Sequence, residues 1–129
     1  MPLVRINRRA GRPPEENRRL LDAVHGALVE AFKIPETDRH QILHEHDPAS
    51  FEITAERTPA FTLVEIAAFP GRSVEAKRAL YASLARRFEA AGVSPADLFV
   101  VLTEPALENW SPRNGVSSLD QKPSFKLNV

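Results

Sequence analysis

The sequence predicts a fold of the α/β (α+β) class: a tandem β-α-β repeat that forms a four-stranded mixed sheet with two helices on one face. Three observations support this prediction. The chain has 129 residues, a length that suits one domain burying roughly two thirds of its unfolded surface. Strand-like and helix-like segments alternate along it, and its second half repeats the first. We expect a single domain over 1–129, with repeat halves at about 2–46 and 61–104 and a C-terminal tail at 105–129.

The repeat has a period of 60 residues. Ten identities relate the segment 3–35 to the residues 60 positions later. The pairs are Leu3/Leu63, Val4/Val64, Ile6/Ile66, Gly11/Gly71, Arg12/Arg72, Glu15/Glu75, Arg18/Arg78, Leu20/Leu80, Ala31/Ala91 and Pro35/Pro95. After a slip of one residue, Leu43-His44-Glu45 matches Leu102-Thr103-Glu104. Parallel strands within each unit need a right-handed helical crossover, which places both helices on the same face.

Four segments are predicted as strands: 2–7, about 40–46, about 61–68 and about 98–103. Two segments with apolar residues at a helical period are predicted as helices: about 14–33 and about 73–91. The first helix begins after the Pro13-Pro14 pair and ends at Pro35. The second begins with Ser73 as a candidate N-cap and ends at Gly92.

The other face of such a sheet is left uncovered, so we expect association through it. The tail is rich in Pro, Ser and Asn and has no periodic pattern. Its residues Trp110, Phe125 and Leu127 nevertheless favour packing against the domain or a neighbouring subunit.

The composition excludes several functions. Seventeen basic and 17 acidic residues cancel, which gives no electrostatic case for nucleic acid binding. The local cluster Arg5, Arg8, Arg9, Arg12, Arg18 and Arg19 is interpreted as a solvated loop and helix face. No cysteine is present, which excludes disulfides and thiol catalysis. No apolar run spans a bilayer and no signal peptide is evident, so a cytoplasmic protein without membrane contact is expected.

The histidines do not suggest a metal site. As strand residues, His40, His44 and His46 share one face, but about 13 Å separates side chains four residues apart on a strand. One ion does not bridge that distance, so we predict no metal. His25 lies beside the apolar stripe of the first helix and is interpreted as a packed or partly exposed residue.

Pro2 has two interpretations. Proline lacks a backbone N–H and is typical of the first residue of a strand or of an edge strand. If Met1 is removed, however, Pro2 carries a secondary amine at the N-terminus. Ordinary α-amines titrate near about 8, and burial or the nearby cations Arg39 and Arg72 would bring this amine toward neutrality. It would then act as a base, or as an acid if it stays protonated.

Two other residues have both a chemical and a structural interpretation. Arg72 follows a glycine at the start of the second helix, where backbone N–H groups favour an anion. Its planar guanidinium suits a carboxylate, although it is also interpretable as an ordinary surface arginine. Asp38 lies in the turn "IPETD", where it is either a catalytic carboxylate or a cap for a backbone N–H.

Met-Pro ahead of a tandem β-α-β repeat resembles the tautomerase superfamily, whose catalytic group is an N-terminal proline. The likeness covers nearly the whole chain. The segments "LLDAVHGALVEAFKIPETDRHQ", "GRSVEAKRALY" and, less closely, "NWSPRNG" resemble the malonate semialdehyde decarboxylase branch. The resemblance implies trimers that work without a cofactor.

The resemblance also implies roles for single residues. Pro2 matches the catalytic proline, and Asp38 matches an aspartate that holds or activates water. Arg72 matches an arginine that binds the substrate carboxylate, and Trp110 matches a tryptophan near the active site. Two positions depart from the family pattern: Pro70 stands in place of a second arginine, and Pro112-Arg113 in place of Phe-Gly.

We therefore expect a cofactor-free enzyme that uses Pro2 as acid or base on small oxo acids. The reaction is either keto–enol tautomerisation or a decarboxylation of the malonate semialdehyde type. Alternatives are a hydratase or dehalogenase of 3-haloacrylate-like acids, and a non-catalytic trimeric binding or structural module with an inert Pro2. The expected partners are a small carboxylate substrate and two further copies of the chain.

Overall fold

The computed structural model describes residues 1–121 of the chain. Its strands and helices are, in chain order, β1 (Pro2–Arg9), α1 (Pro14–Phe32), β2 (His40–His46), β3 (Thr62–Ala68), α2 (Val74–Ala90) and β4 (Leu98–Thr103). Short 3-10 helices follow or precede them at Pro48–Ser50, Pro95–Asp97, Leu107–Asn109 and Ser118–Asp120. All six predicted elements are present. Phe125 and Leu127, for which packing was predicted, lie outside the described residues.

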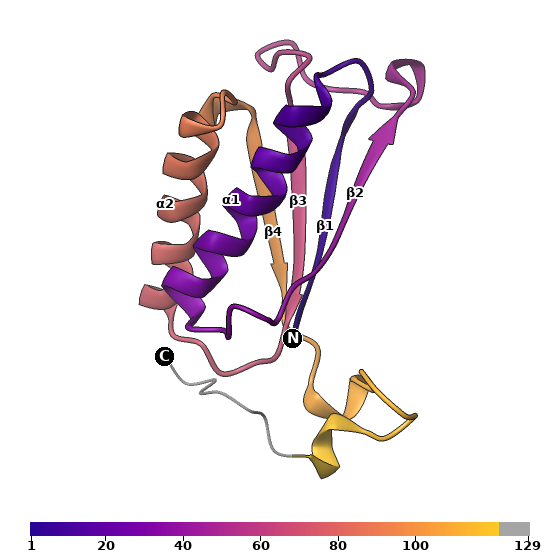
Figure 1. Cartoon of the computed structure of the whole chain (residues 1–129), viewed down its shortest axis with the longest axis vertical. Helices are drawn as coiled ribbons and strands as arrows, with labels where there is room; N and C mark the ends of the chain where they lie inside the picture. The colour runs from indigo at the N-terminus through magenta and orange to yellow at the C-terminus, as the bar shows by residue number, and fades with distance from the viewer. Residues whose placement is uncertain (122–129) are drawn as a thin grey trace.

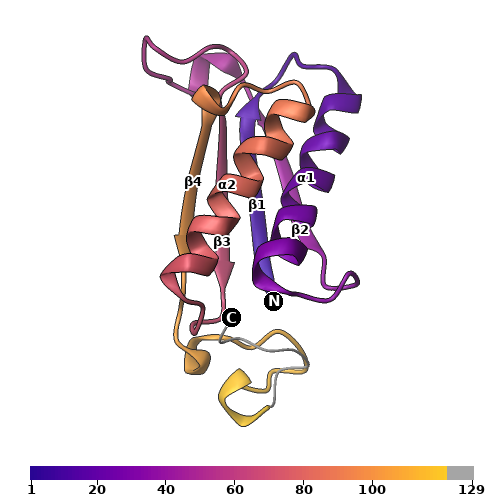
Figure 2. The same ribbon diagram turned by 90° about the vertical axis from the view of Figure 1, so that its left-hand side faces the viewer.

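The four strands form one mixed sheet in the order β2-β1-β3-β4. The pairs β1–β2 and β3–β4 are parallel, whereas the two central strands β1 and β3 run antiparallel. Both helices cover the same face of the sheet (Figures 1 and 2). The predicted fold class is therefore confirmed. Because β1 and β3 are antiparallel, equivalent positions of the two repeat halves lie at opposite ends of the sheet.

The ends of the helices follow from local chemistry. The Ser73 side chain accepts a hydrogen bond from the backbone N–H of Ala76, so the predicted N-cap of α2 is confirmed. Helix α1 ends slightly earlier than predicted because Lys33 adopts a left-handed conformation with a φ of 57°. Such a residue closes the last turn before Pro35 is reached.

The core lies between the helices and the covered face of the sheet. Side chains from all of these layers are at most 1% exposed. They include Val4, Ile6, Leu20, Val24, Leu28, Phe32, Val64, Ile66, Leu80, Leu84 and Phe88. Burial of each such side chain stabilises the fold by about 1.5–3 kcal/mol. The helical periods identified in the sequence therefore mark the buried faces of α1 and α2.

One part of the basic cluster is not solvated. Strand β1 extends two residues beyond its predicted end, and Arg8 within it is fully buried. Its guanidinium donates to Glu16 at 2.6 Å and to Asn17 at 3.0 Å. The prediction of a solvated face is thus wrong for Arg8, although it holds for Arg18 with its 77% exposed side chain. A charge on a buried strand position is tolerated because a buried carboxylate pairs with it.

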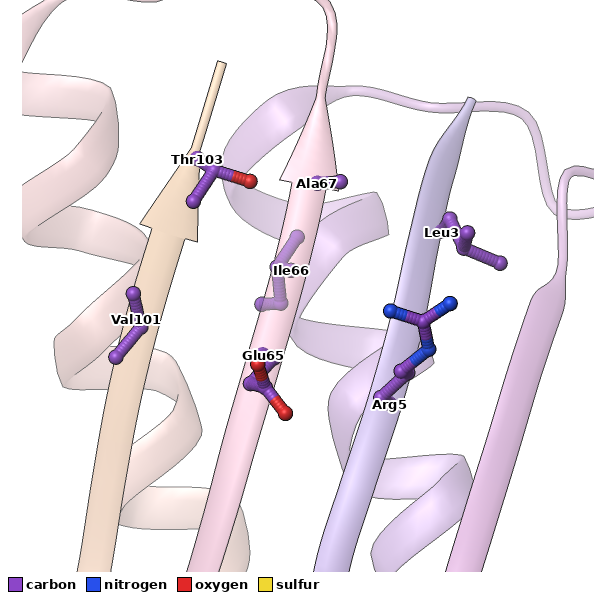
Figure 3. Close-up of a pocket in the computed structure, with 7 residues that line it drawn as sticks. All are labelled: Leu3, Arg5, Glu65, Ile66, Ala67, Val101 and Thr103. Carbon is purple, nitrogen blue, oxygen red and sulfur yellow. The ribbon is translucent and has the colours of Figure 1, made fainter. Parts of the chain in front are cut away.

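The face of the sheet opposite the helices, called here the open face, is uncovered in the chain. Its side chains include Ile42 and Phe99, which are 53% and 46% exposed. A shallow pocket on it is lined by side chains from the two central strands and β4, among them Arg5, Glu65 and Val101 (Figure 3). The predicted uncovered face is confirmed.

The histidines of β2 lie on this open face. His46 shares a hydrogen bond of 3.0 Å with Asn7, and the rings of His44 and His46 stack with centroids 4.1 Å apart. Within residues 1–121, no group of three or more His, Asp or Glu side chains is arranged to hold a metal ion. His25 is buried, as its position beside the apolar stripe predicted. No helix in this part of the chain has the length and apolar character needed to cross a membrane.

Candidate active site

The four residues singled out in the sequence lie at one end of the sheet, called here the Pro2 end. At this end β1 begins, β3 and β4 finish, and the loops leading into β2 and α2 pass (Figure 1). Pro2 opens β1, and Asp38 lies in the loop before β2. Arg72 immediately precedes the cap of α2, and Trp110 follows β4. The topology therefore brings together residues that are up to 108 positions apart in the sequence (110 − 2).

Pro2 is buried and pairs with Ala68 of β3. Since β1 lies between β2 and β3, the interpretation of Pro2 as the start of an edge strand is wrong. A proline is accommodated in this inner strand because it is the first residue, where a missing N–H removes no central ladder bond.

The N-terminal amine lies beside Asp38. With Met1 in place, the terminal ammonium donates to Oδ2 of Asp38 at 2.6 Å, and the Asp38 side chain is only 10% exposed. The turn that presents this carboxylate is closed by the hydrogen bond from the Asp38 backbone N–H to the Pro35 carbonyl at 3.0 Å. The Asp38 carboxylate thus pairs with the chain terminus, which favours its interpretation as a chemical group over that as a backbone cap.

Arg72 is buried, with 6% of its surface exposed, so its interpretation as an ordinary surface arginine is wrong. Its Nη1 donates to the Phe69 carbonyl at 3.1 Å, and its guanidinium carbon lies 4.8 Å from the centroid of the Phe32 ring. Burial lowers the pKa of Arg72, while the carboxylates of Glu104 and Asp38 oppose that shift. The group nevertheless stays cationic at neutral pH, because an arginine titrates far above it.

Two further aromatic side chains pack next to the segment that carries this guanidinium. The Phe69 ring meets the Trp110 ring edge to face, with centroids 5.1 Å apart. The Trp110 indole N–H donates to the Pro105 carbonyl at 3.0 Å, and the Trp110 carbonyl accepts from the Ser118 backbone N–H at 2.8 Å. Trp110 therefore packs against the segment next to Arg72 and also anchors the chain that follows β4.

An ion pair joins α2 to the end of β4. Lys77 in the first turns of α2 binds Glu104, which directly follows β4, at 2.5 Å. In the sequence, Glu104 stands out only as part of the repeat, and no role was predicted for Phe69 or Lys77. The signal for Phe69 was its position directly before Pro70-Gly71-Arg72. Pro112 and Arg113, which also depart from the family pattern, are exposed. They lie in a turn closed by the Arg113–Val116 bridge.

A terminal amine, a carboxylate and a buried guanidinium at one end of a β-α-β sheet are the parts of an acid–base site for a small anion. Comparison with known proteins agrees with this class. Two family models, both described as "Tautomerase enzyme", match residues 2–57 and 38–113. The chain belongs to the tautomerase superfamily.

Individual relatives support the assignment. The chain is 35% identical over 118 residues to "Probable tautomerase YrdN" of Bacillus subtilis (strain 168), a match that covers 86% of this chain and 90% of that protein. It is also similar to the crystal structure of FG41 malonate semialdehyde decarboxylase inhibited by 3-bromopropiolate. That match has 35% identity and a TM-score of 0.81, covering 88% of this chain and 91% of the other.

A third structure carries information on assembly. The symmetric trimer of the wild-type fused 4-OT named Q0 matches with 29% identity and a TM-score of 0.79. This match covers 91% of this chain and 96% of the other.

The family models, the relative and the decarboxylase structure together confirm the predicted family and its likeness to malonate semialdehyde decarboxylase.

Proposed function

We propose that the chain, once Met1 is removed, uses the Pro2 amine as an acid or base on a small oxo acid. The reaction is keto–enol tautomerisation or a decarboxylation of the malonate semialdehyde type. The observation that carries the proposal is the 2.6 Å contact between the terminal ammonium and Asp38. It puts the N-terminus beside a carboxylate at the end of the sheet that also holds the buried Arg72.

In the proposed mechanism, Arg72 binds the substrate carboxylate through its guanidinium. Burial strengthens this contact because less water competes with it. The amine of Pro2 then faces the carbonyl. As a neutral base it takes a proton from the carbon next to the carbonyl and returns it to another atom of the enol. As an ammonium held by Asp38, it instead donates a hydrogen bond to the carbonyl oxygen, which accepts electron density as carbon dioxide leaves.

A second candidate reaction is hydration or dehalogenation of a 3-haloacrylate-like acid, with Asp38 holding the attacking water. The observation that favours it is the similar decarboxylase whose crystals were inhibited by 3-bromopropiolate. Turnover of phenylenolpyruvate, malonate semialdehyde and a 3-haloacrylate, compared side by side, separates the tautomerase, decarboxylase and hydratase alternatives.

The proposal predicts that the mature protein lacks Met1 and that Pro2→Ala lowers turnover at least about tenfold. This is less than the roughly 10²–10⁴-fold of a full general acid–base contribution, because the alanine amine partly substitutes. Intact mass and steady-state kinetics test both. Alanine still offers a primary amine, so a glycine inserted between Met1 and Pro2 is the sharper variant. It keeps every side chain but turns the Pro2 nitrogen into an amide. Full activity in both variants, or a retained Met1 in active protein, would show that the Pro2 amine is not the catalyst. A retained Met1 together with no turnover of any of the three substrates would favour the non-catalytic binding module.

We also propose a homotrimer formed through the open face. Exposed apolar residues such as Ile42 and Phe99 on that face favour association, and the similar Q0 protein is described as a symmetric trimer. Multi-angle light scattering at micromolar concentration is the test. A species of the single-chain mass of 14.4 kDa would rule the trimer out.

A further inference from the structure

We propose that Glu104 restricts the site to acids with a single carboxylate. This inference rests on the proposed function, in which Arg72 binds the carboxylate of the substrate. It adds a residue that selects ligands by charge and does not take part in the reaction.

Glu104 is tied to the surroundings of Arg72 from two sides. On the first side, the Arg72 guanidinium donates to the Phe69 carbonyl, and the Phe69 ring packs against Trp110. The Trp110 indole in turn donates to the carbonyl of Pro105, the residue after Glu104. This run of contacts fixes the segment at the end of β4 relative to the guanidinium.

The second side runs through α2. Glu104 binds the ammonium of Lys77 at 2.5 Å. The backbone N–H of Lys77 donates to the carbonyl of Ser73, the residue after Arg72, at 3.1 Å. The side chains of Glu104 and Lys77 are 23% and 27% exposed, so solvent screens them only in part. The first set of contacts therefore fixes the backbone next to Glu104, and the second fixes the Glu104 carboxylate. Both fix it relative to the segment that carries Arg72.

The charges at the Pro2 end then nearly cancel. The carboxylates of Glu104 and Asp38 both act on the Arg72 guanidinium and raise its pKa against the effect of burial. Together with Lys77 they give two positive and two negative side chains. Nearby Arg39 is paired with Asp22. Among the described residues of this group, the positive charge left over is at most the single one of the terminal ammonium.

A monocarboxylate matches that single charge. A dicarboxylate brings a second negative charge that meets no spare cation and lies near Glu104 and Asp38. Like charges in a partly buried site repel strongly because little solvent screens them. We expect the unmodified site to bind a monocarboxylate at least about tenfold more tightly than a dicarboxylate of the same length, since even one modest charge contact is worth that factor.

The experiment measures binding without turnover. Trp110 is the single tryptophan of the chain and lies against Phe69, so its fluorescence reports ligands at this end. The full chain without Met1 is titrated with butanoate and with succinate at neutral pH and constant ionic strength. Both acids have four carbons and differ in the number of carboxylates. The variants are Glu104→Gln, Lys77→Met and the two combined, with exposed Glu108→Gln as the matched control.

The charge explanation makes opposite predictions for the two single variants. Glu104→Gln removes a negative charge and should narrow the preference for butanoate over succinate by about tenfold. Lys77→Met removes a positive charge and should widen that preference. The double variant restores the original charge and should regain the original preference, and Glu108→Gln should leave it unchanged. These results would support the proposal.

Other outcomes would overturn it. If Glu104→Gln and Lys77→Met shift the preference in the same direction, the ion pair only attaches the segment after β4 to α2. Equal binding of butanoate and succinate by the unmodified chain would refute the charge selection and leave the proposed function intact. If neither acid binds the unmodified chain, or if Arg72→Ala leaves their binding unchanged, the carboxylate site itself is wrong and the inference falls with it.

Discussion

Equivalent arginines lie at the two ends of the sheet, and their side chains contact different partners. Arg12 and Arg72 are repeat partners, and each follows a glycine at the start of a helix. Arg12 donates from Nε and Nη2 to the two carboxylate oxygens of Glu16, at 3.0 and 2.9 Å. The position equivalent to Glu16 in the second half is Ala76. The first half thus supplies an internal carboxylate for its arginine, whereas the second half has a methyl group at that position.

The aspartates at the two ends differ in a similar way. After the one-residue slip in the repeat, Asp38 matches Asp97. Asp97 is buried and accepts hydrogen bonds from the Thr58 backbone N–H, at 2.8 Å, and from the Thr58 hydroxyl. Asp38 accepts instead from the chain terminus. Equivalent positions of the two halves thus have different partners. At the Arg12 end these are the Glu16 carboxylate and Thr58, and at the Pro2 end they include the Phe32 ring and the chain terminus.

Removing the Glu16 carboxylate should give the largest effect, a loss in the free energy of unfolding. Glu16→Ala leaves the fully buried Arg8 without its ionic partner, and breaking a buried pair from one side costs about 3–5 kcal/mol of the free energy of unfolding. Urea denaturation at a fixed protein concentration measures it. The neighbouring exposed Glu15→Ala is the control and should change little. Similar losses for the two variants would mean that the buried pair at the Arg12 end contributes no special stability.

Substitutions of Arg72 and Arg12 should affect kcat/KM differently. One charge-assisted hydrogen bond is worth about 1.5–3 kcal/mol, so Arg72→Ala should lower kcat/KM for a carboxylate substrate by about 10–150-fold. Arg72→Lys keeps the charge but loses the planar guanidinium and should recover only part of that loss. Arg12→Ala should leave kcat/KM close to that of the unmodified enzyme. Equal losses at Arg12 and Arg72 would mean that the carboxylate site has been assigned to the wrong end.

Low pH should reduce the stabilisation that Glu16 provides through its ion pairs with Arg8 and Arg12. Burial raises the pKa of Glu16, but hydrogen bonds from Arg12 and Arg8 outweigh burial and hold the pKa below its ordinary value of 4.5. The unfolded chain therefore binds more protons, and the stabilisation is present above the ordinary value and lost as the pH falls through the lower folded value. The stability advantage of the unmodified chain over Glu16→Gln should accordingly shrink between about pH 5 and pH 3. An advantage that stays constant down to the lower pH would contradict this.

The smallest effect concerns how the two helices begin. The Ser73 hydroxyl accepts from the Ala76 backbone N–H at 3.1 Å, whereas Pro13, at the equivalent position before α1, makes no side-chain cap. Ser73→Ala should lower the free energy of unfolding by about 1 kcal/mol, a typical loss for such a cap. Chemical denaturation compares it with exposed Ser111→Ala. A loss no greater than that control would show that α2, like α1, does not depend on its cap.

Much of the fold was predictable because its signals are local or repeated. The helical periods, the Ser73 cap and the repeat from Leu3 to Pro95 together indicate six elements and their connections. The gathering of Pro2, Asp38 and Arg72 at one end was expected from the resemblance, and the strand directions then account for it. Parallel pairing within each half puts the start of β1 next to the loop before β2.

What the sequence did not reveal depends on tertiary partners. Arg8 was interpreted as solvated because its neighbours in the chain are also basic, and only the folded chain brings the Glu16 carboxylate to it. The contact of Arg72 with the Phe32 ring joins segments 40 residues apart (72 − 32). Glu104 had no distinguishing neighbour in the sequence, because its partner Lys77 is reached only across the end of the sheet.

The two repeat halves give the sheet two equivalent strand starts, but only one of them can carry the terminal amine. Thr62 opens β3 at the position where Pro2 opens β1, and both residues are buried. A polypeptide has a single α-amine. In a chain built from two such halves, one strand therefore starts at the terminal amine and the other starts at an ordinary peptide bond. A reagent that modifies only the N-terminal amine would therefore be taken up once per chain, although the architecture offers two strand starts. Opening the chain within the 47–61 connection, directly before Thr62, would create the second terminus.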